Sequence, residues 1–187
     1  MTQSPSIDPS WRTNPPSPTR IRQLGPSDAA VFQELRLRGL REAPWAFGST
    51  YEEDKALSLE TIAQRLTPSP SPRGQCVFGA FVEDALVGIA GCAQNSKQKA
   101  RHKASVWGMY VDPASRGHGT ARALLEHIVA EARTWPGVER LLITVMARAE
   151  AARHLYRDMG FEVYGYEPDA LRQDGESDAM EYLRLSL

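Results

Sequence analysis

Apolar residues between positions 121 and 132 recur with the period of an amphipathic helix. They are spaced three or four residues apart, while charged and polar side chains take the opposite face. Two glycines stand at the start of this segment and Pro136-Gly137 follows its end, as expected at helix boundaries. The apolar stripe consists of Ala121, Leu124, Leu125, Ile128, Val129 and Ala132.

The segments on both sides of this helix have the pattern of strands. Leu141–Met146 is a short, nearly continuous apolar run, which is typical of a strand buried on both faces. Ala104–Val111 precedes the helix and ends at Asp112-Pro113. A strand, a helix and a second strand in this order predict a parallel crossover unit.

Further strands are predicted at both ends of the chain. Ile21 and Leu24 indicate a first strand, and Ala179–Leu185 alternates like a closing strand after a long excursion that follows Tyr164. Two strands in between, Cys76–Glu83 and Leu86–Gln94, predict a hairpin that turns at Glu83-Asp84.

Two helices are expected between the first strand and the hairpin. Ser27 or Asp28 is a suitable cap for the first, and the second covers about 58–66. The residues expected to point inward are Val31, Phe32 and Leu35 in the first helix, and Leu59, Ile62 and Leu66 in the second.

Proline and serine mark the segments outside this pattern. Residues 1–18 predict a disordered tail with Trp11 as its one candidate anchor, and Thr67–Gly74 predicts a loop. The remaining residues, 19–187, then form a single α/β (α+β) domain in which helices flank a mixed central sheet.

Composition narrows the class of protein. A chain of 187 residues suits one domain, and a net charge of −1 lacks the basic footprint of a nucleic-acid-binding protein. No apolar run approaches the length of a membrane span and the N-terminus lacks an apolar signal core, so we expect a cytoplasmic protein without membrane contact. Cys76 and Cys92 stand in apolar surroundings and are expected to be reduced core residues. The four histidines show no metal-ligand spacing, so no metal is expected.

The loop at residues 116–119 carries the strongest chemical signal. A helix that opens on Gly117 and Gly119 exposes backbone N–H groups at its positive end, which is a site for phosphate or pyrophosphate. A Cβ at either glycine would hold such a group away from the backbone and penalise a positive φ. Arg116 and Arg122 add positive charge nearby.

Two other phosphate loops fit less well. A Walker-type loop needs Gly-Lys-Ser/Thr, which does not occur in the chain. The dinucleotide fingerprint matches at Gly117 and Gly119, but its third glycine would be Arg122. Glu139 lies at a plausible distance for a ribose contact, so this alternative is weakened and ranks second.

The segment Arg116-Gly117-His118-Gly119-Thr120-Ala121 resembles the Gln/Arg-x-x-Gly-x-Gly/Ala motif of GNAT-superfamily acyltransferases, which bind acetyl-CoA. Upstream, Met109–Pro113 resembles the fourth strand of that family. Downstream, Ala151–Phe161 resembles its A-x-x-L-Y-x-x-x-G-F signature. Weaker similarity extends over roughly 19–185, and Leu40–Thr50 is similar to a bacterial subgroup.

This resemblance implies acetyl-CoA as the cosubstrate. Backbone groups of Met109 and Val111 would bind the pantetheine arm, and Gly108 would form the bulge that opens the strand. The residues expected to bind the cosubstrate are Met109, Tyr110, Val111, Arg116, Gly117, His118, Gly119, Thr120, Ala121 and Arg122.

The resemblance also implies a catalytic residue. Tyr156, four residues before Gly160, would protonate the departing thiolate, and a phenol with a pKa near ~10 is a suitable donor. Tyr156 also belongs to an apolar helical stripe, so a purely structural role as a core aromatic remains the alternative. Family members often carry Asn where this chain has Ala149, and losing one neutral hydrogen bond costs about 1 kcal/mol.

No general base stands out. Amines are mostly protonated at neutral pH, so a base is useful, yet Ile143-Thr144-Val145 offers no acid where many relatives have one. Glu42, Glu53, Glu83 and Asp84 remain, and Glu42 is preferred because it adjoins a segment expected to wall the acceptor site. Trp45 and Trp107 are expected to be packing residues, with pocket lining as the alternative.

Two functions follow as hypotheses. The first is an N-acetyltransferase that moves acetyl from acetyl-CoA directly to a primary amine of a small molecule or a peptide or protein. The second is a non-catalytic acyl-CoA-binding or sensing module. Residues 42–53 and 164–176 are expected to shape the acceptor pocket, and a homodimer is expected from the family.

Overall fold

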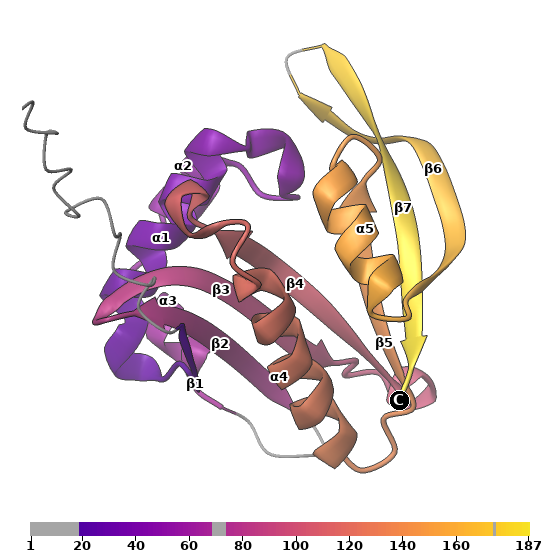
Figure 1. The fold of residues 1–187 in the computed structure, drawn as a ribbon, viewed down its shortest axis with the longest axis horizontal. Coiled ribbons are helices and arrows are strands. Elements are labelled where there is room, and N and C mark those ends of the chain that lie inside the picture. Colours follow the sequence, from indigo (N-terminus) through magenta and orange to yellow (C-terminus); the bar gives the residue numbers. More distant parts are fainter. Residues whose placement is uncertain (1–18, 69–73, 174) are drawn as a thin grey trace, which may run out of the picture.

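The chain folds around one mixed β-sheet. The computed structural model describes residues 19–68, 74–173 and 175–187, and the expected tail at 1–18 and most of the expected loop at 67–74 lie outside this part (Figure 1). The seven described strands have the order β1-β2-β3-β4-β5-β7-β6. They are β1 (Arg20–Gln23), β2 (Gln75–Val82), β3 (Ala85–Gln94), β4 (Lys103–Val111), β5 (Arg140–Met146), β6 (Glu162–Gln173) and β7 (Glu176–Ser186).

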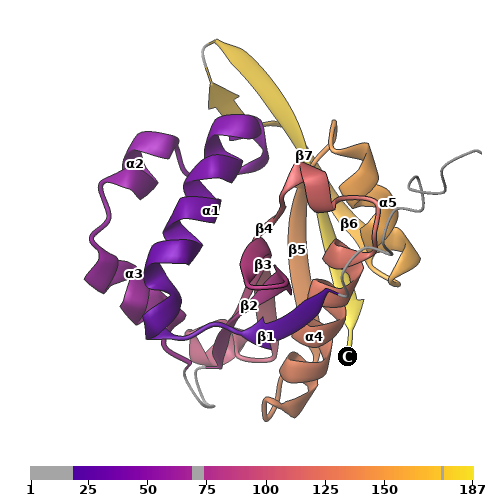
Figure 2. The ribbon, with the colours of Figure 1, turned by 60° about the vertical axis from the view of Figure 1, so that its left-hand side comes forward.

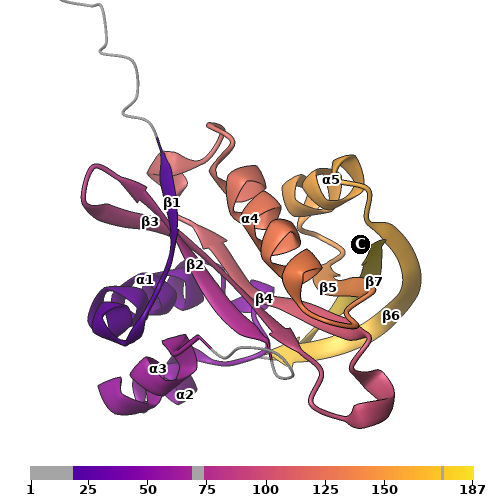
Figure 3. The same cartoon turned by 90° about the horizontal axis from the view of Figure 1, so that it is seen from below.

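Helices cover both faces of this sheet. On one face lie α1 (Ala29–Glu42), α2 (Tyr51–Lys55) and α3 (Leu59–Leu66), and on the other lie α4 (Thr120–Thr134) and α5 (Glu150–Asp158), as Figures 2 and 3 show. Each face has its own apolar core. One core includes Phe32 and Ile62, and the other includes Leu124 and Ile128. The predicted fold class, a mixed sheet flanked by helices, is confirmed.

Most predicted elements are present within a residue or two. The β2–β3 hairpin, helix α4 and the parallel pairing of β4 with β5 are confirmed. The dinucleotide-binding alternative is not supported, because β4 and β5 form the one parallel pair among the described strands. Cys76 and Cys92 are buried, unbridged and opposite one another on β2 and β3, as expected for core thiols.

Two predicted core residues are wrong. Val31 is 45% exposed because α1 buries a stripe through Phe32 and Leu35 that leaves position 31 facing outward. Leu59 is 52% exposed because it is the first residue of α3, which buries only its later turns through Ile62 and Leu66.

Residues 162–186 form a long hairpin, where the sequence predicted a long excursion after Tyr164 and a closing strand only at Ala179–Leu185. Strands β6 and β7 pair up to Gln173 and Glu176, and Gly175 turns the chain with φ +85°. The register shifts between Glu167 and Leu171, so Pro168 lies in an irregular part of an edge strand. Proline and many polar residues hide this strand in the sequence.

Strands β4 and β5 share only a short pairing before they separate. Their register covers Lys103–Ser105 against Arg140–Leu142, and Figure 1 shows the two strands diverging beyond it. Gly108, with φ +64°, lies in the predicted bulge, where two residues of β4 oppose one of β3. The alternate residues of β5 that are buried are Leu141, Ile143 and Val145. Thr144 points to the opposite face and is exposed, so the expectation of a strand buried on both faces is wrong.

Candidate functional site

The loop between β4 and α4 leaves the helix N-terminus open. A carboxylate oxygen of Asp112 accepts a hydrogen bond from the N–H of Ala114 (3.1 Å) and so begins a short 3-10 turn, Pro113–Ser115. Gly117 and Gly119 both have positive φ, +78° and +79°, and no atom of the described part of the chain would lie within 4 Å of a Cβ on either. The glycines are therefore required by the backbone conformation, and they leave free space beside the first N–H groups of α4.

A cavity of about 390 Å³ adjoins this loop, and we call it the loop cavity. It lies between β4, the N-terminus of α4, and α5. Every predicted cosubstrate-binding residue lines it except His118, which is exposed to solvent. The sequence prediction thus selected residues that the fold brings together: Met109, Tyr110, Val111, Arg116, Gly117, Gly119, Thr120, Ala121 and Arg122.

The main chain of β4 presents alternate residues to this cavity. The N–H of Asp112 donates to the carbonyl of Val87 (2.8 Å), so Val111 and its partner Gly88 form a pair that shares no hydrogen bond. The N–H and C=O of Val111 therefore point to the side where β5 has separated. The next residue, Tyr110, has the opposite orientation, and its main chain faces Ile89 of β3.

Arg116 is held by the protein. Its Nε donates to the carbonyl of Val111 (2.8 Å) and its Nη2 to Glu42 (2.6 Å). Glu42 also accepts the hydroxyl of Tyr110 (2.5 Å). The charge of Arg116 is therefore partly neutralised beside the loop. Arg122 is freer, with one exposed contact of 3.7 Å to Asp158.

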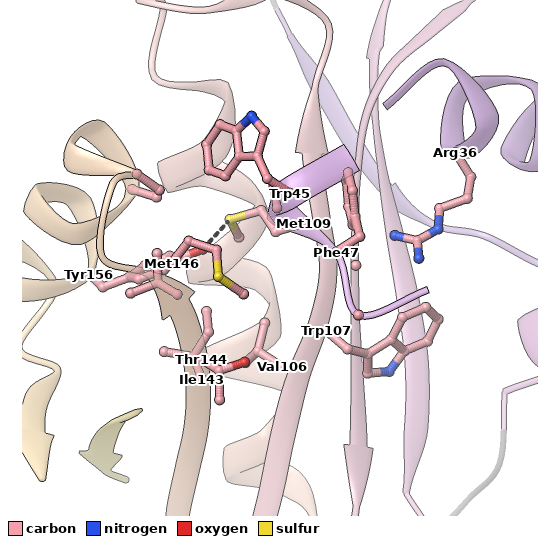
Figure 4. A pocket seen from close by; sticks show the side chains of 16 residues that line it. Arg36, Trp45, Phe47, Val106, Trp107, Met109, Ile143, Thr144, Met146 and Tyr156 are labelled. Carbon is pink, nitrogen blue, oxygen red and sulfur yellow. Dashed lines mark hydrogen bonds between the residues drawn. The ribbon is translucent and has the colours of Figure 1, made fainter. Parts of the chain in front are cut away.

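A second cavity, of about 290 Å³, lies between the separated strands, and we call it the strand cavity (Figure 4). Its walls come from β4, β5 and the segment Trp45–Gly48. Trp45 and Trp107 both line it, which supports the pocket-lining alternative, and Trp107 also packs against the core as expected. Ala149 lies in its wall at the N-terminal end of α5.

The preferred base candidate does not reach either cavity. Glu42 lines neither of them and is occupied by Arg116 and Tyr110. Glu53 accepts the N–H of Thr50 (2.7 Å) and so caps α2, while Glu83 and Asp84 stand at the β2–β3 turn. Among the described residues that line the strand cavity, the one charged side chain is Arg36, which sequence reasoning missed.

Tyr156 lines both cavities. Its side chain is buried, and its hydroxyl donates to the thioether sulfur of Met109 (3.4 Å), drawn as a dashed line in Figure 4. Burial raises the pKa of this phenol above its ordinary value, which keeps it protonated. The ring also packs against Phe161 at 6.0 Å, so the core-aromatic interpretation describes part of its role.

The segments expected to shape an acceptor pocket do meet beside the strand cavity. Leu171 and Arg172 of β6 line a neighbouring cavity of about 310 Å³ together with Trp45 and Glu52. Within the described ranges no three His, Cys, Asp or Glu side chains are grouped to hold a metal ion. None of the described helices combines the length and apolar character needed to cross a membrane.

Solved structures share this fold at low sequence identity. An acetyltransferase of the GNAT family from Streptococcus pneumoniae has a TM-score of 0.79 at 23% identity, over 91% of this chain and 100% of that one. The structure of yncA from Salmonella typhimurium, solved with its cofactor acetyl-CoA, has a TM-score of 0.76 at 21% identity, over 91% and 94% of the two chains. A ribosomal-protein-alanine N-acetyltransferase from Brucella melitensis has a TM-score of 0.75 at 24% identity, over 90% and 99%.

Comparison of sequences identifies a similar protein and a family whose model matches this chain. Protein ML0378 of Mycobacterium leprae, whose own name calls it uncharacterized, is 36% identical over 93 residues. That match covers 50% of this chain and 24% of the relative, so the chain spans only about a quarter of that protein. The family model described as acetyltransferase (GNAT) family matches residues 37–161, which include the loop, α4 and Tyr156. This protein therefore belongs to the GNAT acetyltransferase family.

Proposed function

We propose that the protein is an N-acetyltransferase that transfers acetyl from acetyl-CoA directly to a primary amine in a ternary complex. One observation carries this proposal: Tyr156 stands in the wall shared by the loop cavity and the strand cavity. A thioester bound in the first cavity and an amine bound in the second would meet beside its hydroxyl.

The loop cavity fits acetyl-CoA as cosubstrate. N–H groups at the start of α4 would hold the pyrophosphate, and the free space beside Gly117 and Gly119 admits it to the backbone. The N–H of Val111, which faces the gap, would donate to an amide of the pantetheine arm as a neighbouring strand does, while its carbonyl already accepts Arg116; we expect Met109 to add main-chain groups on the same side. This arrangement directs the thioester toward the bulge at Gly108.

The proposed chemistry is a direct displacement. The amine nitrogen attacks the thioester carbonyl carbon, a C–N bond forms and the C–S bond breaks. Tyr156 donates its hydroxyl proton toward the sulfur, and N–H groups of β4 stabilise the carbonyl oxygen. In the structure this hydroxyl already donates to a sulfur atom, that of Met109, which is a weak acceptor and is readily exchanged for a stronger one.

The amine must also lose a proton. Among the described lining residues of the strand cavity there is no carboxylate and no imidazole. We therefore propose that water in the cavity accepts this proton. On this basis the enzyme favours acceptors with less basic amines, of which a larger fraction is neutral at a given pH.

Release of coenzyme A thiol tests the function. The protein is mixed with acetyl-CoA and a panel of primary amines, free thiol is followed with a chromogenic disulfide, and acetylated products are identified by mass spectrometry. Thiol release that depends on an amine and yields an N-acetyl product is the expected result. Binding of acetyl-CoA without turnover on any amine would contradict it and would favour a binding or sensing module, to which Ala149 lends some support.

A further inference from the structure

Arg36 is a buried cation with one side of its guanidinium unused. It is 9% exposed, and its Nε and Nη2 donate to Asp54 at 3.2 and 3.1 Å. Nη2 also donates to the hydroxyl of Ser49 (2.8 Å). Nη1 is buried and has no hydrogen-bond partner among the residues that the structure describes. Unpaired donors on buried cations are costly, so this nitrogen points to a partner that arrives with a ligand.

The charges around Arg36 do not cancel. Asp54 is shared with Arg65, whose Nη1 lies 3.4 Å from the carboxylate. Burial opposes the charged form of Asp54, but the Ser49 hydroxyl and the two arginines outweigh it and lower its pKa, so the carboxylate stays ionised. Two cations, Arg36 and Arg65, share one anion, Asp54, which leaves an excess of positive charge beside the middle of α1.

This positive charge faces the strand cavity. Arg36 is a lining residue, and a Cβ at Gly108, in the bulge, would lie 3.8 Å from Nη1. The ring of Phe47 covers the face of the guanidinium, with its centroid 4.3 Å from Cζ, and Figure 4 shows it between Arg36 and Met109. Stacking occupies the face of a guanidinium and leaves its in-plane N–H groups available.

We propose that the acceptor amine carries a carboxylate, as an α-amino acid does, and that Nη1 of Arg36 binds it. This rests on the proposed function, since it assigns the acceptor of the same site. Because Nη1 is buried and the Phe47 ring covers the guanidinium, binding of the carboxylate requires a side-chain movement of Phe47. The apolar walls at Trp45, Trp107 and Met146 fit an apolar side chain on the same molecule. A further cation beside Arg36 and Arg65 is unfavourable, which selects against polyamines as acceptors.

Matched substrates test this in the unmodified protein. Initial rates are measured for apolar α-amino acids and for their carboxamides. We expect kcat/KM to be about 10- to 100-fold higher for the acids, because a hydrogen bond between charged groups is lost in the amide. The amine of an amide is less basic, which by itself favours the amide, so a preference for the acid is a stringent result.

Variants locate the effect. Arg36→Gln should remove the preference for the acid, mainly through KM, while coenzyme A binds as before. Arg65→Gln is the matched control, because it removes the other arginine on Asp54, one that does not line the strand cavity, and it should keep the preference. If Arg36→Gln does not fold, the deaminated acid of the best substrate should still inhibit the unmodified protein competitively, and its amide should not.

The outcomes distinguish a failure of this inference from a failure of the proposed acetyltransferase activity. If no amine is acetylated, the proposed function fails. If amides are acetylated as well as acids, the whole inference is overturned, carboxylate and Arg36 alike. If the acids are preferred but Arg36→Gln keeps the preference, only the assignment of Arg36 is overturned.

Discussion

At the scale of single residues, the side chain of Tyr156 is buried and yet borders both cavities. Its position between two cavities gives the hydroxyl access to both, while the apolar surroundings raise its pKa and hold it as the neutral phenol. A raised pKa makes a weaker acid but a dependable hydrogen-bond donor to charge that develops on sulfur.

Tyr156→Phe is expected to lower kcat by about 10²-fold or more, because general-acid catalysis contributes at least that much. Coenzyme A affinity and thermal stability should change little, because only an O–H···S contact is lost. Steady-state kinetics and calorimetry measure these effects, and Tyr164→Phe, at an exposed position, is the control. A variant that turns over normally would remove Tyr156 from the mechanism.

The pH dependence has a definite sign. A general acid loses activity as pH rises through its pKa, and burial moves that pKa of Tyr156 upward. We therefore expect kcat to show no decline from tyrosine ionisation near pH ~10, the ordinary value. A falling limb well below that pH, absent from Tyr156→Phe, would contradict the burial argument.

Gly119→Ala should weaken coenzyme A binding by about tenfold, because a Cβ projects into the space beside the helix N-terminus. Its positive φ also costs about 1 kcal/mol of stability. Gly137→Ala, at φ +75° after α4, is the matched control. Both variants should lose similar stability in urea unfolding, and only Gly119→Ala should lose affinity in calorimetry.

At the scale of elements, α5 is held on β7 by a partly buried ionic cluster. Glu181 accepts Arg153 at 2.5 Å and Arg157 at 3.0 Å, and its own side chain is 8% exposed. Because α5 carries Tyr156, these contacts position the catalytic candidate as well as the helix. The Arg153 hydrogen bond lowers the pKa of Glu181 below its usual value near 4.5.

Glu181→Ala is expected to cost about 1–2 kcal/mol of unfolding free energy at pH 7. Since the folded-state pKa is lowered, this stabilisation is complete above about pH 4.5 and is lost as the pH falls through the folded value. Urea unfolding at pH 7 and pH 3 should therefore show a smaller difference between the two proteins at pH 3. Glu162→Ala, which breaks an exposed contact to Arg184, should have almost no effect.

At the scale of the molecule, the site exists because the sheet opens. β4 and β5 are paired at one end, and the cosubstrate is proposed to fill the gap where they separate. A ligand that binds only the folded state stabilises it by mass action.

Coenzyme A at about 100 times its Kd should add roughly 2.7 kcal/mol and raise Tm by about 5–10 °C. Thermal unfolding followed by circular dichroism measures this shift, with adenosine as a control that lacks the pyrophosphate. Equal increases in Tm with both compounds would show that the loop does not bind the pyrophosphate.

Local patterns in the sequence determined much of this protein. The α4 stripe, the two glycines before it and the apolar strands on both sides follow from periodicity and backbone preference, which act over a few residues. Backbone preference also selected the loop glycines, whereas Tyr156 and the β4 residues were selected because short contiguous motifs resemble those of the GNAT family. Edge strand β6 was missed because Pro168 and its polar neighbours obscure the alternation.

Only the tertiary structure determined which residues lie around the gap between β4 and β5. Where β4 and β5 part depends on a register shared by strands 37 residues apart, as Lys103 opposite Arg140 shows. The pairing of Arg36 with Asp54, and the nitrogen it leaves unused, depends on how α1 and α2 pack. Local propensity encodes elements, but contacts between distant elements are set by the packing of the whole core, so the acceptor side of the site emerges only in the folded molecule.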